Sequence, residues 1–341
     1  MNLPSVFEKY RAEIDAELKA SLAARQSPLY DMMRYHLGWI DSQGDPLKDS
    51  AGKALRPTLC LLACHMAGGD FRHALPAAAA IELVHNYSLI HDDIQDDDRE
   101  RRHRPTVWSL WGKPQAINTG TAMRLVASRT LSRLGKYGIP LSKQATVYEI
   151  LDEATLKLLE GQYLDISYES RFDIGIPDYI RMVEGKTAAL IACSLEIGAL
   201  LGTDDEKTVR CLRDIGWNLG LAFQIRDDIL GIWGDQGRTG KPLGSDIQHR
   251  KKTLPVAYLL EKADHSQRLQ LIEVYKSETV DEDGIARVLR MLDSLDARSQ
   301  SQMIAEQYYQ ATVRLIDQLA LPSSAKQDLE EMGHFLIKRD F

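Results

Sequence analysis

The chain has 341 residues, of which 44% are apolar and 27% are charged, so it can bury a substantial core and has the composition of an ordinary folded protein. Its net charge of −7 argues against a nucleic-acid partner, because binding to a phosphate backbone depends on an excess of lysine and arginine. Length alone would allow about two domains.

Targeting and redox signals are weak. The four cysteines lie in apolar stretches without C-x-x-C spacing, so we expect buried, reduced thiols rather than disulfides or zinc ligands. The first 25 residues mix apolar and charged side chains and lack the continuous apolar core of a secretory signal. Polar residues such as Glu82 and Glu196 interrupt the longest apolar stretches, so no transmembrane segment is expected. These features predict a cytoplasmic protein.

Apolar residues recur at helical intervals along nearly the whole chain. Alternating strand patterns are nearly absent, and no repeat or Pro/Ser-rich linker divides the sequence. We therefore expect an all-α fold, with residues 1–341 forming a single domain, a helical bundle around a central cavity. Helices are predicted over residues 6–24, 28–40, 56–67, 76–96, 114–134, 141–169, 177–201 and 204–233, followed by shorter, more polar helices over 254–340.

Five carboxylates stand in seven residues at the end of the predicted helix 76–96, and four arginines follow within six residues. Crowded carboxylates repel one another, and a hard cation with a preference for oxygen relieves that repulsion. Asp92 and Asp96 lie one turn apart on the same face of a helix, with His85 two turns earlier. A magnesium and phosphate site is one interpretation; a solvated helix end is the other.

A second acidic motif, F-Q-I-R-D-D-I-L-G, stands at the end of the predicted helix 204–233. Gln224 and Asp227 share a face of that helix. A loop with four glycines and Lys241 follows, but it lacks the spacing of a Walker P-loop. Two apolar helices that both end in Asp-Asp indicate two walls of one metal-bridged cavity.

Two basic motifs are candidate anion sites. Lys186 has apolar helical neighbours on every side, so its charge is costly to bury unless an anion meets it. A lysine that extends its amine to solvent is the alternative. Lys53 and Arg56 stand where a loop leads into a helix, which suits an anion but is equally compatible with ordinary surface charge.

Taken together, residues 53–253 resemble the trans-isoprenyl diphosphate synthases, the polyprenyl synthetase family, whose motifs appear here in the expected order. The resemblance implies a Mg²⁺-dependent condensation of isopentenyl diphosphate with an allylic diphosphate, with three magnesium ions and a homodimeric enzyme. It assigns catalytic roles to Asp92, Asp93, Asp96, Arg101, Lys186, Asp227 and Lys241, and magnesium to Asp92, Asp96, Asp227 and Asp228.

The resemblance also assigns the two diphosphates. Isopentenyl diphosphate would contact Arg102 together with Lys53, Arg56 and His85. The allylic diphosphate would contact Arg101 together with Lys186, Thr187, Gln224, Lys241 and Lys251. No protein nucleophile is needed, and the departing diphosphate is the family's expected base.

Product length is expected to depend on the turns that precede the first acidic motif, where Val84, Tyr87 and Ser88 lie. Tyr87 is the fifth residue before Asp92, and the motif carries no insertion. This combination resembles the geranylgeranyl (C20) type; a farnesyl (C15) product is the alternative.

The sequence departs from the family pattern at Gly231, where the second motif usually has its last aspartate, with Asp235 as a possible substitute. His103 stands where a glycine usually follows the arginine pair, and Thr121 stands in place of an aspartate. A class I terpene cyclase is a more remote alternative, but the second motif differs from the cyclase pattern. A non-catalytic partner subunit would be expected to lose one acidic motif, and both are present.

Overall fold

A computed structural model gives the structure of residues 4–47, 52, 54–234, 243–321 and 323–338. Helices make up nearly all the regular structure of these residues, which confirms the predicted all-α fold. The chain divides into two compact units. The first unit contains residues 3–153 and 193–212, and the second contains residues 154–192 and 213–341. Helices α7, α9 and α10 contribute residues to both.

The first unit is built from helices close to those predicted. They are α1 (Ser5–Leu22), α2 (Pro28–His36), α3 (Leu55–Met66), η1 (Phe71–Ala74), α4 (Leu75–Gln95), α5 (Val107–Trp111), α6 (Lys113–Leu131), η2 (Ser132–Tyr137) and the first half of α7 (Leu141–Tyr168). Helix α2 ends before the predicted residue 40 because Gly38 adopts a left-handed backbone with φ of 78°.

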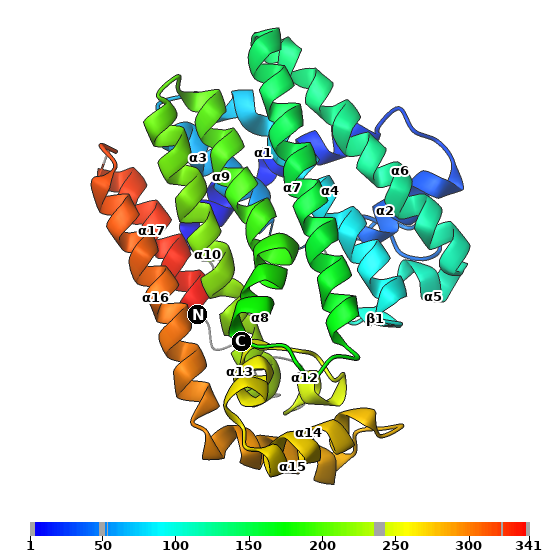
Figure 1. Ribbon diagram of the computed structural model, residues 1–341. Helices are drawn as coiled ribbons and strands as arrows, with labels where there is room; N and C mark the ends of the chain where they lie inside the picture. The colour runs from blue at the N-terminus through cyan, green and yellow to red at the C-terminus, as the bar shows by residue number, and fades with distance from the viewer. Residues whose placement is uncertain (1–3, 48–51, 53, 235–242, 322, 339–341) are drawn as a thin grey trace. The chain divides into compact units, whose positions relative to one another are not determined.

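Helix α4 is the centre of the first unit and lies beside α6 (Figure 1). Its first half is almost completely buried, and four consecutive alanines, residues 77–80, let neighbouring helices approach closely. Ile81, Leu83 and Ile90 continue the buried surface toward the acidic end. Burying each such side chain contributes roughly 1.5–3 kcal/mol, so packing fixes the direction in which α4 presents its last turn.

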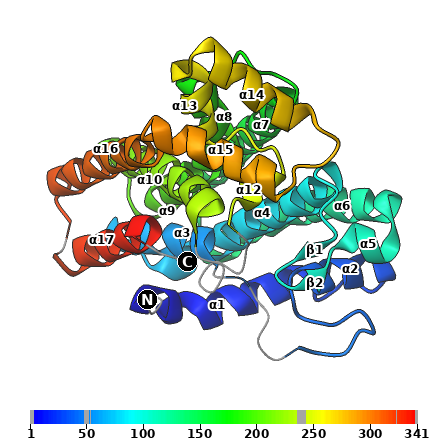
Figure 2. The same cartoon turned by 90° about the horizontal axis from the view of Figure 1, so that it is seen from below.

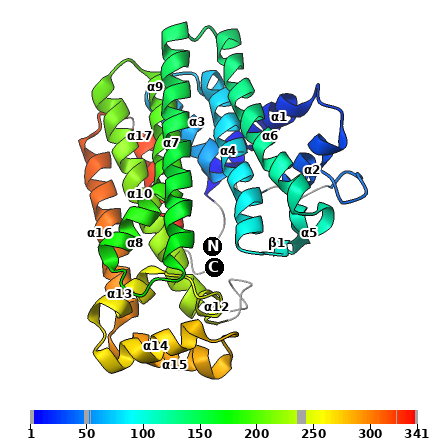
Figure 3. The ribbon, with the colours of Figure 1, turned by 45° about the vertical axis from the view of Figure 1, so that its right-hand side comes forward.

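A short β-hairpin, which the sequence did not predict, follows α4. Strands β1 (Glu100–Arg101) and β2 (Arg104–Pro105) pair in antiparallel register, with Arg101 opposite Arg104. The hairpin leads directly into α5, beside which β1 lies in Figure 3. Two-residue strands leave no alternation to recognise in a sequence, which explains why the arginine-rich run resembles a loop.

The second unit contains the rest of the helices. They are the end of α7, α8 (Ile176–Val183), η3 (Glu184–Ala188), the start of α9 (Ala189–Gly202), most of α10 (Glu206–Trp233), α12 (Ser245–Gln248), α13 (Leu254–Lys262), α14 (His265–Lys276), α15 (Glu282–Ser294), α16 (Ala297–Gln318) and α17 (Ser323–Lys338). Helices α14 and α15 lie side by side, as do α16 and α17 (Figures 2 and 3). Buried residues of α8, α10, α13, α14, α15 and α16 form the hydrophobic core of this unit.

The predicted helix 177–201 is present as one helix, Ile176–Gly202, but it is not α-helical throughout. Five residues, Glu184–Ala188, form a π-helical turn between α8 and α9. A π-turn rotates the side chains that follow it and is common at functional sites. Lys186 and Thr187 lie in this turn.

Among the described residues, one stretch, Ile176–Gly202, is as long and apolar as a membrane span. However, 72% of its apolar window is buried by the protein itself. The core helix of a folded protein has the same composition, so length and apolarity alone do not place this stretch in a membrane.

Glycines let α9 approach α3 within the first unit. A side chain at Gly198 would overlap the carbonyl oxygen of Cys60 and lie 2.8 Å from Cβ of Ala63. We therefore expect Gly198→Ala to lower the free energy of unfolding, because overpacking against a rigid backbone costs about 1–3 kcal/mol. Gly135→Ala is the matched control, since its nearest neighbour is the Gln144 side chain at 3.4 Å. Urea denaturation measures both, and equal stability of the two variants would contradict the close packing.

Candidate active site

The acidic end of α4 is electrostatically unfavourable without a counter-charge. Asp92 and Asp93 lie in the last turn of α4, and Asp96 caps its end by donating its backbone N–H to the Asp92 carbonyl oxygen. The C-terminal end of a helix carries partial negative charge, which adds to the repulsion among the three carboxylates. A cation is therefore the ligand that this end of the helix favours most.

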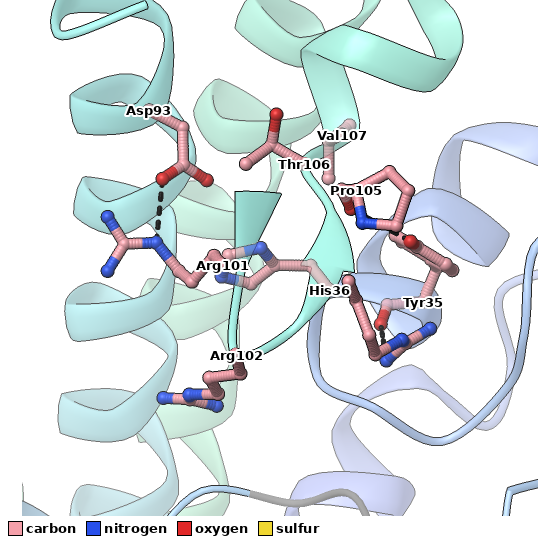
Figure 4. Close-up of a pocket in the computed structure, with 9 residues that line it drawn as sticks. Tyr35, His36, Asp93, Arg101, Arg102, Pro105, Thr106 and Val107 are labelled. Atoms are coloured by element: carbon pink, nitrogen blue, oxygen red, sulfur yellow. Dashed lines mark hydrogen bonds and ion pairs between the residues drawn. The ribbon is translucent and has the colours of Figure 1, made fainter. Parts of the chain in front are cut away.

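Arg101 supplies part of that positive charge. Its Nε donates to Asp93 Oδ1 at 2.6 Å (Figure 4). Its Nη2 lies 3.5 Å from Asp92 Oδ2. Asp93 is only 1% exposed, and its burial raises its pKa to about 6 although Arg101 acts in the opposite direction. The other oxygen, Asp93 Oδ2, is buried without a hydrogen-bond partner among the residues that the structure describes. The carboxylate is thus only partly satisfied by the protein.

The hairpin turn fixes where the arginine pair points. Arg102 and His103 form the two-residue turn, and both have left-handed backbones, with φ of 54° and 59°. Turns of this handedness match the twist of a hairpin, and glycine adopts them most easily. His103 thus adopts a backbone that glycine takes most easily, at the position where the resemblance leads one to expect glycine.

Positive charge accumulates around Arg102. The pKa of Arg56 falls to about 10 because the side chain is buried, an effect that Glu82 partly offsets. The pKa of His85 falls well below its usual value, first by burial and then because Arg56 and Arg102 lie nearby. Glu82, itself buried, is the carboxylate that both arginines approach. In this cationic cluster, defined as Arg56, His85 and Arg102, the two arginines carry more positive charge than Glu82 balances, as an anion site requires.

Gly52, which precedes α3, lies close to this cationic cluster. A side chain at Gly52 would lie 2.9 Å from the guanidinium nitrogens of Arg102. Arg11 of α1 donates to the Gly52 carbonyl oxygen at 2.7 Å. Lys53, predicted to contact the same diphosphate, lies outside the described residues.

A cavity of about 270 Å³ opens beside the arginine pair (Figure 4). Tyr35 and His36 of α2, Asp93 and the hairpin arginines line it. Arg104 is structural, because it donates to the carbonyl oxygens of Tyr35 and Ile40 and stacks on the Tyr35 ring. Arg101 and Arg102 are the lining arginines that the family resemblance assigns to the diphosphates.

Within the second unit, the π-turn directs Lys186 toward Asp165 of α7, with which it forms an ion pair. Gly161 and Gly185 allow this contact. A side chain at Gly161 would overlap the backbone of Lys186, and one at Gly185 would overlap the carbonyl oxygen of Lys157. Asp165 was missed in the sequence because a single acid at the end of a long amphipathic helix carries no signal by itself.

Thr187 and Gln224 also meet in the second unit. The Thr187 hydroxyl donates to Gln224 Oε1 at 2.8 Å, and Gln224 Nε2 donates to Asp228 Oδ1 at 3.0 Å. Asp228 Oδ2 accepts the backbone N–H of Leu254 at 3.0 Å. Burial raises the pKa of Asp228 to about 7. Gln224 therefore contacts Asp228, one residue beyond the Asp227 with which the sequence paired it.

The other predicted site residues of the second unit are more exposed to solvent. Asp227 is half-buried on α10, and Lys251 is exposed. The Lys251 backbone N–H donates to the Asp246 carbonyl oxygen at 2.9 Å, which ties its loop to α12. Lys241 lies outside the described residues.

Gly231 has a structural explanation that involves Asp246. A side chain at Gly231 would overlap the carboxylate of Asp246, which is 8% exposed. The Asp246 carboxylate thus takes the space beside position 231, and the sequence did not reveal this because fifteen positions separate the two residues (231 to 246). Asp235, the substitute considered from the sequence, lies outside the described residues.

This fit makes a specific prediction for stability. Gly231→Ala should destabilise the protein by about 1–3 kcal/mol, because the new methyl group displaces the Asp246 carboxylate. In an Asp246→Ala background the same change should cost much less, since the overlapping atoms are gone. A double-mutant cycle by chemical denaturation measures the coupling, and purely additive effects would contradict the assignment of Asp246 to this space.

The donor chemistry of the acidic residues fits magnesium. Carboxylate oxygens are its preferred protein ligands, and magnesium commonly binds one or two of them while keeping water and phosphate oxygens. Among the described residues no group of three or more such side chains already surrounds one point. The unsatisfied Asp93 Oδ2 is a carboxylate oxygen that a hard cation could use.

The structure brings the predicted residues together in two sets. Asp92, Asp93 and Asp96 lie with Arg101 and the cationic cluster in the first unit, and Lys186, Thr187, Gln224, Asp227 and Asp228 lie in the second. That the two sets form one cavity stays a prediction.

Comparison with known proteins decides the family. A family model described as polyprenyl synthetase matches residues 38–292. The chain belongs to the polyprenyl synthetase family. A (2E,6E)-farnesyl diphosphate synthase of Mycobacterium tuberculosis is 37% identical over 93% of this chain and 88% of that protein. A geranylgeranyl diphosphate synthase of the same organism is 35% identical over 98% of this chain and 94% of that protein.

A solved structure agrees with this assignment. The polyprenyl synthetase from Streptomyces coelicolor superposes with a TM-score of 0.90 at 35% identity, covering 98% of this chain and 99% of that chain. The predicted family, the all-α fold and the predicted prenyltransferase class are therefore confirmed for this polyprenyl synthetase.

Proposed function

We propose that this polyprenyl synthetase condenses isopentenyl diphosphate with an allylic diphosphate to give an all-trans prenyl diphosphate, and that it needs magnesium. The observation that carries the proposal is the division of charge in the first unit. Carboxylates gather at the end of α4, and the cationic cluster of Arg56, His85 and Arg102 lies close by. An allylic diphosphate, which would bind through metal, matches the acidic end of α4. Isopentenyl diphosphate, which would need only positive charge, matches the cationic cluster.

Asp92 and Asp96 would hold magnesium in the first unit, and Asp227 in the second. When bound, magnesium would neutralise the allylic diphosphate and make it a better leaving group. Arg101 and Lys186 would then exchange Asp93 and Asp165 for diphosphate oxygens, which keeps both cations paired before and after binding. The resemblance adds Lys53, Lys241 and Lys251 to these contacts.

The same contacts stabilise charge that develops as the C–O bond breaks. Arg102, with Arg56 and His85, would hold isopentenyl diphosphate so that its double bond attacks the allylic carbon. The proton that is lost goes to the departing diphosphate, so no side chain is needed as a base.

The C20 product is favoured over C15 by Tyr87. Its side chain is buried, and its ring meets His91 edge-on with centroids 5.7 Å apart. Val84 is also buried, and the Ser88 hydroxyl donates to the His85 carbonyl oxygen at 2.7 Å. Because Tyr87 is braced by a second ring, it is suited to limit chain growth. The relatives do not separate the two products, since both names occur among them at similar identity.

Incubation of the purified protein with magnesium, isopentenyl diphosphate and C5, C10 or C15 allylic diphosphates tests the proposed reaction. We expect a C20 prenyl diphosphate, sized by chromatography after removal of the diphosphate. Cyclised hydrocarbon without isopentenyl incorporation would instead indicate a terpene cyclase. Absence of turnover with every primer would indicate a non-catalytic partner subunit.

Truncation of Tyr87 should change product length. Tyr87→Ala is expected to shift the main product at least one isoprene unit beyond C20, because it removes the bulk that limits growth. Tyr87→Phe is the matched control and should keep the wild-type product, since the ring remains. An unchanged product distribution in Tyr87→Ala would show that another residue sets the length.

We also propose that the chain is one functional domain, forms a homodimer and acts in the cytoplasm without nucleic-acid partners. Apolar side chains on α6 support the homodimer, because Ile117 and Leu125 are 49% and 62% exposed. Such exposure favours a protein interface. Sedimentation velocity measures the oligomeric state, and a monomer at micromolar concentration would contradict the dimer.

A further inference from the structure

Lys252 is a buried cation outside the proposed set of substrate contacts. It lies in the connecting segment, residues 249–253, which leads from α12 to α13 in the second unit. Its side chain is only 3% exposed. Lysine is almost never buried so completely, because its charge loses the solvation of water. The Lys252 side chain therefore needs a specific environment.

Two aromatic rings and one carbonyl group supply that environment. The Lys252 Nζ lies 4.7 Å from the centroid of the Phe172 ring and 4.8 Å from that of the Tyr275 ring. It also donates to the carbonyl oxygen of Glu169, the residue that follows α7, at 2.8 Å. A cation is attracted to aromatic faces at these distances, and the attraction is stronger where water is excluded. The ammonium thus connects its segment to the end of α7 and to α14.

The charge of Lys252 opposes folding at neutral pH. Burial lowers the pKa of Lys252 to about 8, with the charge of Glu169 acting in the opposite direction and that of Arg250 in the same one. A lysine whose pKa is lower in the folded chain than in the unfolded chain holds its proton less tightly after folding, which makes folding less favourable below that pKa. A methionine of similar length would avoid this cost. Stability alone therefore does not account for Lys252.

Arg250 anchors the connecting segment at a second point. Its Nη2 donates to the carbonyl oxygens of Ser277 and Glu278, just beyond the end of α14, at 2.7 and 2.6 Å. Its backbone is left-handed, with φ of 57°, which residues other than glycine, asparagine and aspartate seldom adopt. Contacts on both sides, at Arg250 and Lys252, therefore hold the residue between them, Lys251.

The anchored segment places Lys251 near the end of α7, where Lys186 also lies. Burial raises the pKa of the Glu169 carboxyl, and the charges of three nearby lysines lower it: Lys252, Lys186 and Lys251. Lys186 pairs with Asp165 of α7, whereas Lys251 is exposed. Two lysines that reach one helix end from different elements can contact a single diphosphate, provided that the connecting segment keeps its position.

We propose that Lys252 is a positioning residue: its ammonium, held at the end of α7 beside two aromatic rings, fixes the connecting segment so that Lys251 and Lys186 meet the same diphosphate. Lys252 itself does not contact the substrate. The catalytic consequence rests on the proposed function, which assigns Lys251 and Lys186 to the allylic diphosphate. The anchoring of the segment does not depend on the reaction.

Lys252→Met tests the proposal, because it keeps the length of the side chain and removes its charge and hydrogen-bond donor. We expect the KM for the allylic diphosphate to rise about tenfold, the effect of one lost charge-assisted hydrogen bond, and the KM for isopentenyl diphosphate to stay within about twofold. Lys276→Met is the matched control and should change neither KM. Lys276 lies 5.9 Å from the same Phe172 ring but is exposed. An unchanged allylic KM in Lys252→Met would overturn the proposal.

A double-mutant cycle shows whether Lys252 acts through Lys251. Lys251→Met alone should also raise the allylic KM about tenfold. Adding Lys252→Met should then change that KM by no more than about twofold, because the lysine that it positions is already gone. A further tenfold rise in the double variant would mean that Lys252 acts on the substrate independently of Lys251, contrary to the proposal.

Hydrogen exchange tests the anchoring without the reaction. The backbone N–H groups of Arg250 and Lys251 each donate at 2.9 Å, to the carbonyl oxygens of Ile247 and Asp246. In Lys252→Met, these amides should exchange at least about tenfold faster, because the segment opens more easily. Tm should stay within about 3 °C of wild type, since the buried charge is removed together with its contacts.

Unchanged exchange in Lys252→Met would overturn the anchoring. A larger fall in Tm would make Lys252 a general stabiliser of the fold and would equally contradict the proposal. If the wild type shows no turnover, the proposed function fails, while hydrogen exchange still decides whether Lys252 holds the connecting segment.

Discussion

The repulsion among carboxylates at the end of α4 is the constraint on which the candidate site depends. Asp92 and Asp93 occupy the last turn of a helix whose dipole already places negative charge there, and Asp96 caps it. Arg101 relieves part of this repulsion, and the proposed magnesium would relieve the rest. The hairpin that carries Arg101 also carries Arg102, so one turn connects the acidic end of α4 to the cationic cluster.

The second unit follows the same principle of paired charges. Lys186 is held by Asp165, and Asp228 is held by backbone and side-chain donors. Ion pairs of this kind keep cations oriented before an anionic ligand arrives, which lowers the reorganisation that binding requires. Glycines at the helix crossings, such as Gly161, make the close approach possible. Packing and electrostatics are therefore linked, since the crossing of α7 past the π-turn brings Lys186 to its partner.

The sequence predicted the helices and the charged motifs well because both depend on local spacing. Apolar periodicity located α4 and α10, and acids clustered within a few residues indicated Asp92, Asp96 and Asp227 as candidate metal ligands. The hairpin at Arg101 and the π-turn at Lys186 escaped prediction, since two-residue strands and a single extra backbone residue leave no periodic signal. Contacts between distant positions, such as Gly231 with Asp246 or Asp228 with Leu254, depend on tertiary packing and could not be found by spacing.

The central claim is that the first unit offers two different charge environments, one that needs metal and one that does not. Isothermal titration calorimetry of isopentenyl diphosphate into the metal-free protein tests this directly. We predict measurable binding without magnesium, weakened at least tenfold by Arg102→Met and unchanged by Asp92→Asn. Binding that requires magnesium, or that survives Arg102→Met unchanged, would contradict the division of charge on which the account rests.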